Sequence, residues 1–197
     1  MALNLEKQLL FYGAYHHNPV NVGIHITCVP AILLTAFLFG TNSPSIPLPP
    51  YLSSETFPLN AGTVAAVLYS GLYILMEPVA GSLLAPLLLG GTAYANHLTK
   101  AYGMTANYLA LGVHVVSWLA QFVGHGAFEG RAPALLDNLV QALFLAPFFV
   151  WFEILFFFGY RPELKARLEK AVEKEIKKFR ESKQGGKAEG AANGTKN

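Results

Sequence analysis

Residues 118–138 read WLAQFVGHGAFEGRAPALLDN and bring polar side chains between two strongly apolar segments. The hydrophobic runs elsewhere in residues 1–160 are almost free of charge. Polar groups inside lipid cost free energy unless they are paired, bound to a metal or functional. We therefore expect the chemistry of the chain to involve the polar residues of this stretch, which are Gln121, His125, Glu129, Arg131 and Asp137.

The composition predicts an integral membrane protein. The 197 residues are 53% hydrophobic and 13% charged, whereas soluble domains carry about 25% charged residues. Of the 14 basic residues, only Lys7, Lys100 and Arg131 precede residue 161, and the other 11 lie between Arg161 and the C-terminus. Nucleic-acid binders carry a basic face on their folded part, and the apolar body of this chain has none.

Five apolar segments predict an all-α, polytopic membrane bundle of four to six membrane helices with a charged C-terminal helix. Residues 1–17 predict a short interfacial helix, and five prolines in Thr41–Asn60 predict an irregular connection. Asn96–Met104 reads as a polar break between two spans. The apolar segments are Val20–Gly40, Ala61–Met76, Val79–Ala95, Thr105–Val123 and Leu139–Phe158.

The distribution of charge divides the chain into three parts. We expect residues 1–160 to form the membrane-embedded catalytic domain, 161–183 a charged cytosolic helix and 184–197 a disordered tail. The basic tail favours a cytosolic C-terminus. An even number of spans would place both ends of the chain on that side.

Two sets of polar residues have helical spacing. His114, Trp118, Gln121 and His125 are four, three and four residues apart, so they share one stripe of a helix, which Glu129 would extend. A second cluster, YHHN at 15–18, leads into Asn21 and His25, and Asn18 with Pro19 predicts a helix start. Imidazole suits iron, zinc or copper. We expect the two clusters to meet and form one metal site.

Several residues keep more than one interpretation. Asp137 either favours the N-terminal end of its helix or orients a liganding histidine. Arg131 either pairs with Glu129 or binds a substrate carboxylate. His97 is expected at the surface, and Glu153, inside an apolar run, requires a partner or a function. The single cysteine excludes an intrachain disulfide and a cysteine-based zinc site.

Two motifs carry a resemblance to a known family. Residues 15–25, YHHNPVNVGIH, followed by Val29 and Pro30, resemble the N-terminal signature of the yeast-type 2-hydroxy fatty acid dioxygenases. The run QFVGHGAFE at 121–129, with PALLDNLVQ at 133–141 and LAPFFV at 145–150, is similar to the core of the same family. The resemblance extends from about Phe11 to Glu163 and is weak across 41–102.

This resemblance implies a multi-pass endoplasmic-reticulum membrane enzyme that uses Fe(II) and O2 to shorten long-chain 2-hydroxy fatty acids by one carbon. Such α-oxidation is a step in phytosphingosine breakdown. By the motifs of the family, iron ligation or its support falls to His16, His17, His25, His125, Glu129 and Asp137. The helical stripe adds His114 as a possible ligand. The expected catalytic residues are His125, Glu129, Arg131 and Asp137.

Two other functions remain open on the sequence. A di-iron membrane fatty acid hydroxylase or desaturase would usually show several histidine boxes, and only His16 and His17 come near one. A non-enzymatic lipid-binding scaffold would use the polar residues to stabilise helix packing. Metal content separates the scaffold from the enzymes, and iron stoichiometry separates one iron from two.

Overall fold

The computed structural model describes residues 4–51, 53–132 and 141–194, and this part of the chain contains helices and loops but no strand. The elements are α1 (Leu5–Tyr15), α2 (Pro19–Thr41), α3 (Ala61–Met76), α4 (Pro78–Tyr102), α5 (Met104–Val123), the π-helices η1 (Gly124–Glu129) and η3 (Gln141–Leu145), α6 (Ala146–Phe157) and α7 (Pro162–Gly194).

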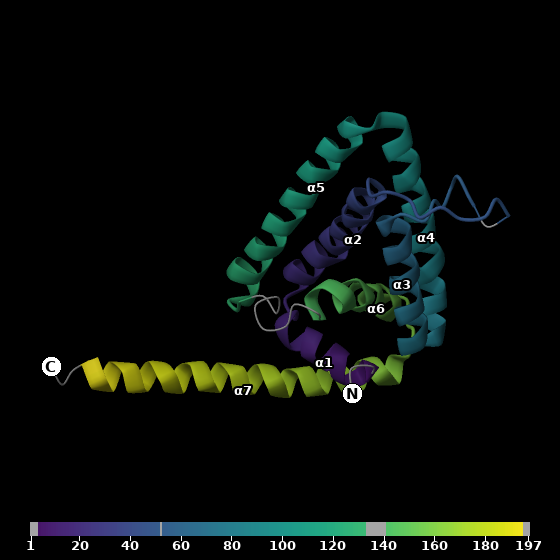
Figure 1. Cartoon of the computed structure of the whole chain (residues 1–197). Coiled ribbons are helices and arrows are strands. Elements are labelled where there is room, and N and C mark those ends of the chain that lie inside the picture. The colour runs from purple at the N-terminus through teal and green to yellow at the C-terminus, as the bar shows by residue number, and fades with distance from the viewer. Residues whose placement is uncertain (1–3, 52, 133–140, 195–197) are drawn as a thin grey trace.

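Helices α2 to α5 run up and down between two ends of the molecule (Figure 1). Residues 42–60 and the α4–α5 turn lie at one end, and α1 and α7 lie together at the other. By length and apolar composition α2, α4 and α5 with η1 can each cross a membrane, whereas α3 is shorter. The segments Leu143–Phe157 and Pro162–Phe179 are long and apolar enough to cross a membrane only when they are taken together, and the chain bends by 117° between them. The predicted helical membrane bundle is confirmed.

The predicted start of the first span is confirmed. Asn18 precedes α2, and its side-chain oxygen accepts a hydrogen bond of 2.9 Å from the backbone N–H of Val20. Pro19 occupies the first turn, where its missing N–H costs nothing. The helix then continues through Pro30 to Thr41.

Two predicted boundaries are wrong. The expected break at Asn96–Met104 is helical to Tyr102, and only Gly103, with φ 51°, separates α4 from α5. Asn96 is part of α4 because its side chain is buried between helices, where it forms hydrogen bonds with the side chains of Asn60 and Thr63. The predicted span Leu139–Phe158 corresponds to η3 and α6, from Gln141 to Phe157, and its predicted start lies outside the described residues. The C-terminal helix continues beyond Lys183 to Gly194, in a stretch that still contains Ala, Glu and Lys.

Aromatic side chains hold α6 in the centre of the bundle. Tyr73 of α3 stacks on Phe148 of α6 with ring centroids 4.6 Å apart, and both side chains are fully buried. The Tyr73 hydroxyl donates a 2.8 Å hydrogen bond to the carbonyl of Phe144. This packing fixes the start of α6, which forms one wall of the site described below.

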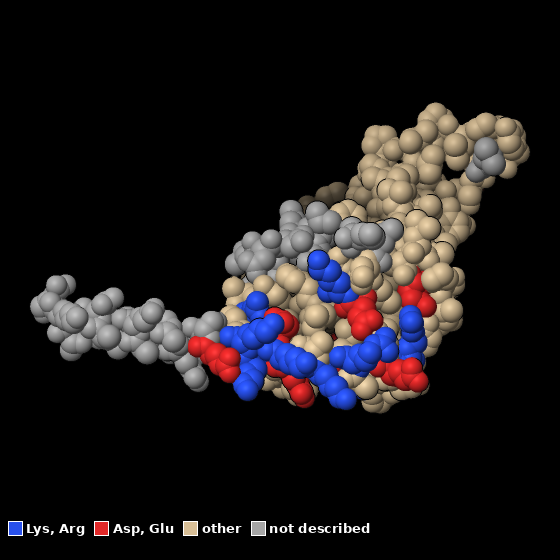
Figure 2. Space-filling view, turned by 90° about the horizontal axis from the view of Figure 1, so that it is seen from below, with Lys and Arg blue, Asp and Glu red and all other residues tan. Residues whose placement is uncertain are grey.

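Charged residues gather on the face formed by α1 and α7 (Figure 2). Arg167 of α7 meets Glu6 of α1, with 3.2 Å between Nε and Oε1. In contrast, α5 exposes apolar side chains such as Leu109, 70% exposed, and Val116, 65% exposed. A charged face at one end and apolar flanks are the surfaces that the interface and the hydrocarbon of a bilayer require.

Gly81 permits the close packing of α3 on α4, and its substitution gives a first prediction. A Cβ at this position would collide with the backbone of Tyr73 and Ile74, whereas a Cβ at Gly90 in the same helix meets nothing within 4 Å. Gly81→Ala is expected to destabilise the protein by about 1–3 kcal/mol, and Gly90→Ala to stabilise it slightly. Thermal unfolding in detergent measures both variants. Equal melting temperatures would contradict the packing described here.

Candidate metal centre

Three histidines from three separate elements meet at one point. His16 follows α1, His25 lies in α2 and His125 lies in η1, and all three are buried. Their ring centroids are 4.4, 4.7 and 4.9 Å apart. One ligand nitrogen from each ring lies within 4.8 Å of the other two. Such a group is compact enough for a single cation after small movements of the rings.

Hydrogen bonds orient two of these imidazoles. Nδ1 of His16 lies 2.9 Å from the carbonyl oxygen of Tyr12, and Nδ1 of His25 lies 2.9 Å from that of Asn21. Each Nδ1–H therefore donates to a backbone carbonyl one turn earlier, which leaves the Nε2 lone pair free. This is the usual arrangement of histidine ligands, because the second hydrogen bond fixes both tautomer and ring orientation.

The environment keeps His16 in the form that binds metal. Burial, and then the neighbouring His25, hold the pKa of His16 well below its usual value, so the ring is neutral at physiological pH. Within the described residues, the buried Nδ1 of His125 has no hydrogen-bond partner. A buried imidazole nitrogen without a protein partner, beside two oriented imidazoles, fits a bound transition metal.

Glu129 connects the two sequence motifs without joining the three histidines. Its Oε1 accepts hydrogen bonds from the backbone N–H groups of His17 and Asn18, both 2.9 Å, and from the side chain of Asn21, 3.1 Å. Its Oε2 lies 2.6 Å from Nδ1 of His17, and the side chain is only 1% exposed. A carboxylate is favourable before the N-terminus of α2. Glu129 thereby fixes η1, and with it His125, against the helix that carries His25.

A glycine allows η1 to approach α2. A Cβ at Gly124 would collide with the Oδ1 of Asn21, a residue with no exposed surface. A Cβ at Gly126, on the other side of His125, would meet nothing within 4 Å. The π-helix ends at Gly130, whose φ of 60° lies in the left-handed region. Single-turn π-helices occur frequently at functional sites.

The other expected site residues lie apart from the three histidines. His17 contacts Glu129. His114 has both ring nitrogens engaged, Nδ1 2.7 Å from Thr35 Oγ1 and Nε2 accepting from the Trp118 indole at 3.0 Å. The helical stripe therefore brings Gln121 and His125 to the site but leaves His114 outside it. Asp137 lies outside the described residues.

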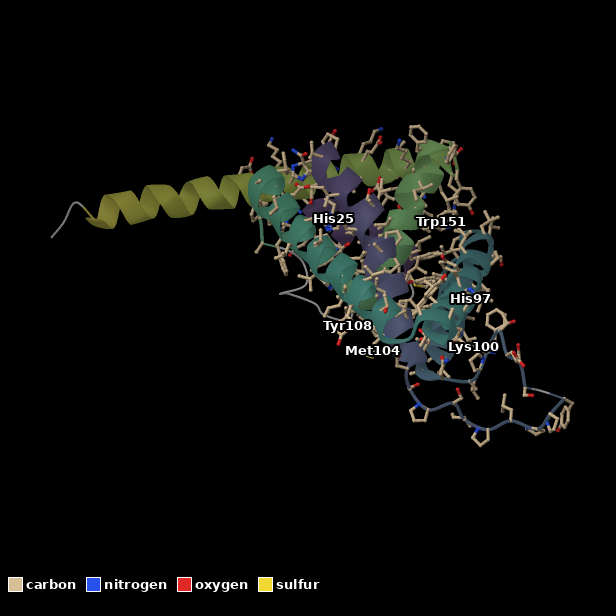
Figure 3. The ribbon with its side chains drawn as sticks, turned by 90° about the horizontal axis from the view of Figure 1, so that it is seen from above. His25, His97, Lys100, Met104, Tyr108 and Trp151 are labelled. Carbon is tan, nitrogen blue, oxygen red and sulfur yellow. The ribbon has the colours of Figure 1, made fainter. Side chains whose placement is uncertain are left out.

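One of the two interpretations of Arg131 was an ion pair with Glu129, and the structure does not contain this pair. Nη1 of Arg131 donates a 3.1 Å hydrogen bond to the carbonyl of Ala14, and the guanidinium lies 3.5 Å above the centre of the Tyr15 ring. Arg131 thus connects the end of η1 to α1. His97 is exposed near the far end of α4, as predicted (Figure 3). Glu153 lies half-buried on α6, where it interacts electrostatically with Lys165 and Glu169 of α7.

An apolar cavity of about 120 Å³ adjoins the three histidines. Gln121 and Tyr12 also line it, and the buried Tyr12 hydroxyl has no hydrogen-bond partner in the described part of the chain. The Tyr12 ring stacks on His16 with centroids 4.0 Å apart. Tyr12 was not predicted from the sequence, although its position four residues before His16 was a usable signal.

Comparisons with known proteins give one family and one curated relative. The model of a family described as "2-hydroxy-palmitic acid dioxygenase Mpo1-like" matches residues 2–158. The 2-hydroxy-palmitic acid dioxygenase MPO1 of Saccharomyces cerevisiae is 42% identical over 183 residues, which cover 92% of this chain and 97% of the yeast protein. No solved structure matches the chain.

Proposed function

The chain belongs to the Mpo1-like family of 2-hydroxy-palmitic acid dioxygenases, and we propose that His16, His25 and His125 hold the Fe(II) with which it oxidatively shortens long-chain 2-hydroxy fatty acids by one carbon. It is a 2-hydroxy fatty acid dioxygenase, since the similarity to the yeast enzyme covers almost the whole of both chains. The observation that carries the iron assignment is the meeting of three imidazoles beside an apolar cavity.

Three neutral imidazoles suit Fe(II), as they suit zinc and copper, and the redox chemistry of the reaction favours iron. Fe(II) held by these three histidines would supply the binding and activation of O2. The protein contributes the orientation of the rings through the carbonyls of Tyr12 and Asn21. It also contributes a largely apolar cavity that limits the access of water to the reacting carbons.

The reaction balances without another reductant. The bond between C1 and C2 of the 2-hydroxy acid breaks, C1 leaves as carbon dioxide, and C2 becomes the carboxyl carbon of the shorter acid. One molecule of O2 accepts the electrons and supplies the oxygen for the new carboxyl group and for one water. The 2-hydroxyl and the carboxylate of the substrate must therefore both lie at the metal centre.

The side chains that face this point can hold the polar end of the substrate. The Tyr12 hydroxyl and the Gln121 amide line the cavity together with the histidines, and each can donate a hydrogen bond to a carboxylate. Glu129 and Arg131 act as positioning residues, because their contacts fix η1 against α2 and α1. The ligand roles suggested for His17 and His114 are not part of this proposal.

We place the enzyme in the endoplasmic-reticulum membrane with α1 and α7 on the cytosolic side. The resemblance to the family supports the choice of membrane, and the basic residues of α7 support a cytosolic location for α1 and α7. The metal centre then lies near the cytosolic interface, since His25 is six residues, about 9 Å of helix, inside the start of α2.

The test of this function is product analysis. Detergent-purified protein, kept anaerobic and supplied with Fe(II), should convert 2-hydroxypalmitate to pentadecanoate with equimolar uptake of O2 and release of C1 as labelled carbon dioxide. Palmitate lacking the 2-hydroxyl should be inert. Formation of an unsaturated or newly hydroxylated acid of unchanged length would instead support the hydroxylase alternative. Absence of any product after iron reconstitution would support the scaffold.

The histidine geometry favours one iron over two. Di-iron sites in helical bundles draw several carboxylates and histidines from four helices. Among the described residues, one group of three metal-ligating side chains is close enough to hold an ion, and it contains no carboxylate. A mononuclear centre therefore accounts for the geometry.

A further inference from the structure

The cavity beside the metal centre extends away from it along one face of α2. Its wall on this helix consists of His25, Val29, Ile32, Leu33 and Ala36, which follow the i, i+4, i+7, i+8, i+11 pattern of one helical stripe. Residues of η3, α5 and α6 form the opposite side. Apart from the end that carries the histidines, Tyr12 and Gln121, this groove is apolar.

The length of the groove matches a long acyl chain. His25 and Ala36 are eleven residues apart, so α2 rises about 16 Å between them. An extended hydrocarbon chain advances about 1.2 Å per bond, as an extended backbone does. With C1 and C2 at the metal centre, a palmitoyl chain would reach Ala36, whereas an octanoyl chain would end near Val29 or Ile32.

The far end of the groove is open in the described part of the chain. Ala36 is exposed, and Leu143, which also lines the groove, is 39% exposed. These exposed residues belong to helices with apolar outer surfaces, so the opening faces hydrocarbon. The metal end lies toward the charged face of α1 and α7, because His25 is near the start of α2, and the open end lies farther along α2.

We propose that this groove binds the acyl chain of the 2-hydroxy fatty acid, which enters sideways from the bilayer, and that contacts at Ala36 favour chains of palmitoyl length over shorter ones. The proposal rests on the proposed function and adds the route and the specificity-determining residue. Because the groove opens at Ala36, chains of palmitoyl length and longer leave it there and continue into the lipid. A carboxylate near the interface and a tail in the hydrocarbon is also how a fatty acid lies in a bilayer.

Hydrogen bonds from α3 hold the wall of the groove that lies opposite α2. The hydroxyls of Tyr69 and Tyr73 donate hydrogen bonds of 3.1 and 2.8 Å to the carbonyls of Leu143 and Phe144. Tyr69 also contacts Phe37 of α2, with ring centroids 5.6 Å apart. These contacts keep a groove between α2 and η3, at the depth of Ala36.

The test replaces Ala36 with tryptophan and compares two substrates. Ala36→Trp is expected to lower kcat/KM for 2-hydroxypalmitate about 10-fold or more, because the last methylenes lose their contacts, while kcat/KM for 2-hydroxyoctanoate stays unchanged. Thr27→Trp is the matched control, since Thr27 is exposed on the same helix and lines no part of the groove. Thermal unfolding of both variants checks that the fold is retained.

The outcomes separate this proposal from the function on which it rests. If the wild-type protein converts neither substrate, the proposed function fails. If it converts both acids and Ala36→Trp changes their kcat/KM by the same factor, or changes neither, the groove is not the acyl site although the function stands. A selective loss that Thr27→Trp reproduces would overturn the proposal as well.

Binding without turnover gives a second readout. Trp118 lines the groove, whereas Trp151 on α6 donates to the carbonyl of Ala80 and lies outside it (Figure 3). In Trp151→Phe, a fatty acid brominated in mid-chain should quench the fluorescence of Trp118, and 2-hydroxypalmitate should reverse the quenching. In Trp118→Phe, reversible quenching of Trp151 should be absent. Equal quenching in both variants, unaffected by 2-hydroxypalmitate, would contradict a specific site.

Discussion

Replacing His25 with alanine is expected to reduce turnover of 2-hydroxypalmitate to background, a loss greater than the roughly 100-fold that changes around metal ligands reach. The substitution removes one of three imidazoles at the centre and leaves the Asn21 carbonyl without its donor. The same result is expected for His16→Ala and His125→Ala. Product formation per mole of membrane-inserted protein is the measurement, because insertion depends on the apolar helices and should not change.

His114→Ala is the matched control for these variants. It also removes a histidine from an apolar helix, but its ring nitrogens contact Thr35 and Trp118 rather than the other histidines. We expect it to retain most of the turnover. A result in which His114→Ala is inactive and His25→Ala is active would reverse the assignment of ligands.

Glu129→Ala is expected to lower turnover about 10- to 100-fold, although Glu129 contacts none of the three histidines. Its carboxylate accepts hydrogen bonds from the N–H groups of His17 and Asn18 and from Asn21, and it is almost completely buried. Without it, these donors lose their partner, each at a cost of about 1–3 kcal/mol, and η1 is released from α2. The iron affinity and the melting temperature should therefore fall together with turnover.

Two comparisons distinguish this positioning role from ligation. Glu129→Gln keeps an acceptor oxygen and should lose less than Glu129→Ala, and excess Fe(II) should restore part of its turnover. His17→Ala removes only one of the four contacts of Glu129 and should lose less again. If Glu129→Gln were as inactive as His25→Ala and did not respond to iron, the carboxylate would be a ligand.

Local signals in the sequence were sufficient to predict most of the fold. Asn18 with Pro19 fixed the start of α2, and the bounds of α3 agree with the apolar run Ala61–Met76. Prediction failed at Asn96 because a polar residue in an apolar segment reads as a loop, whereas tertiary contacts to Asn60 and Thr63 allow it to remain helical. Such contacts are not visible in a local pattern.

The candidate site was predictable in its residue types and not in its geometry. The two motifs indicated which histidines matter, but the helical stripe that joined His114 to His125 ended where the α-helix changes to a π-helix at Gly124. That change of pitch aims Glu129 at the start of α2 instead of along the stripe. Tyr12 was not predicted because its only signal is its position four residues before His16, and only the fold shows that it lines the cavity.

The iron content of the anaerobically purified protein tests the central claim most directly. Elemental analysis should find close to one iron per chain in the wild type and in His114→Ala, and almost none in His16→Ala, His25→Ala and His125→Ala. Two irons per chain, or zinc in place of iron after reconstitution, would contradict a mononuclear Fe(II) centre. One iron that persists in all three alanine variants would show that these histidines do not hold it.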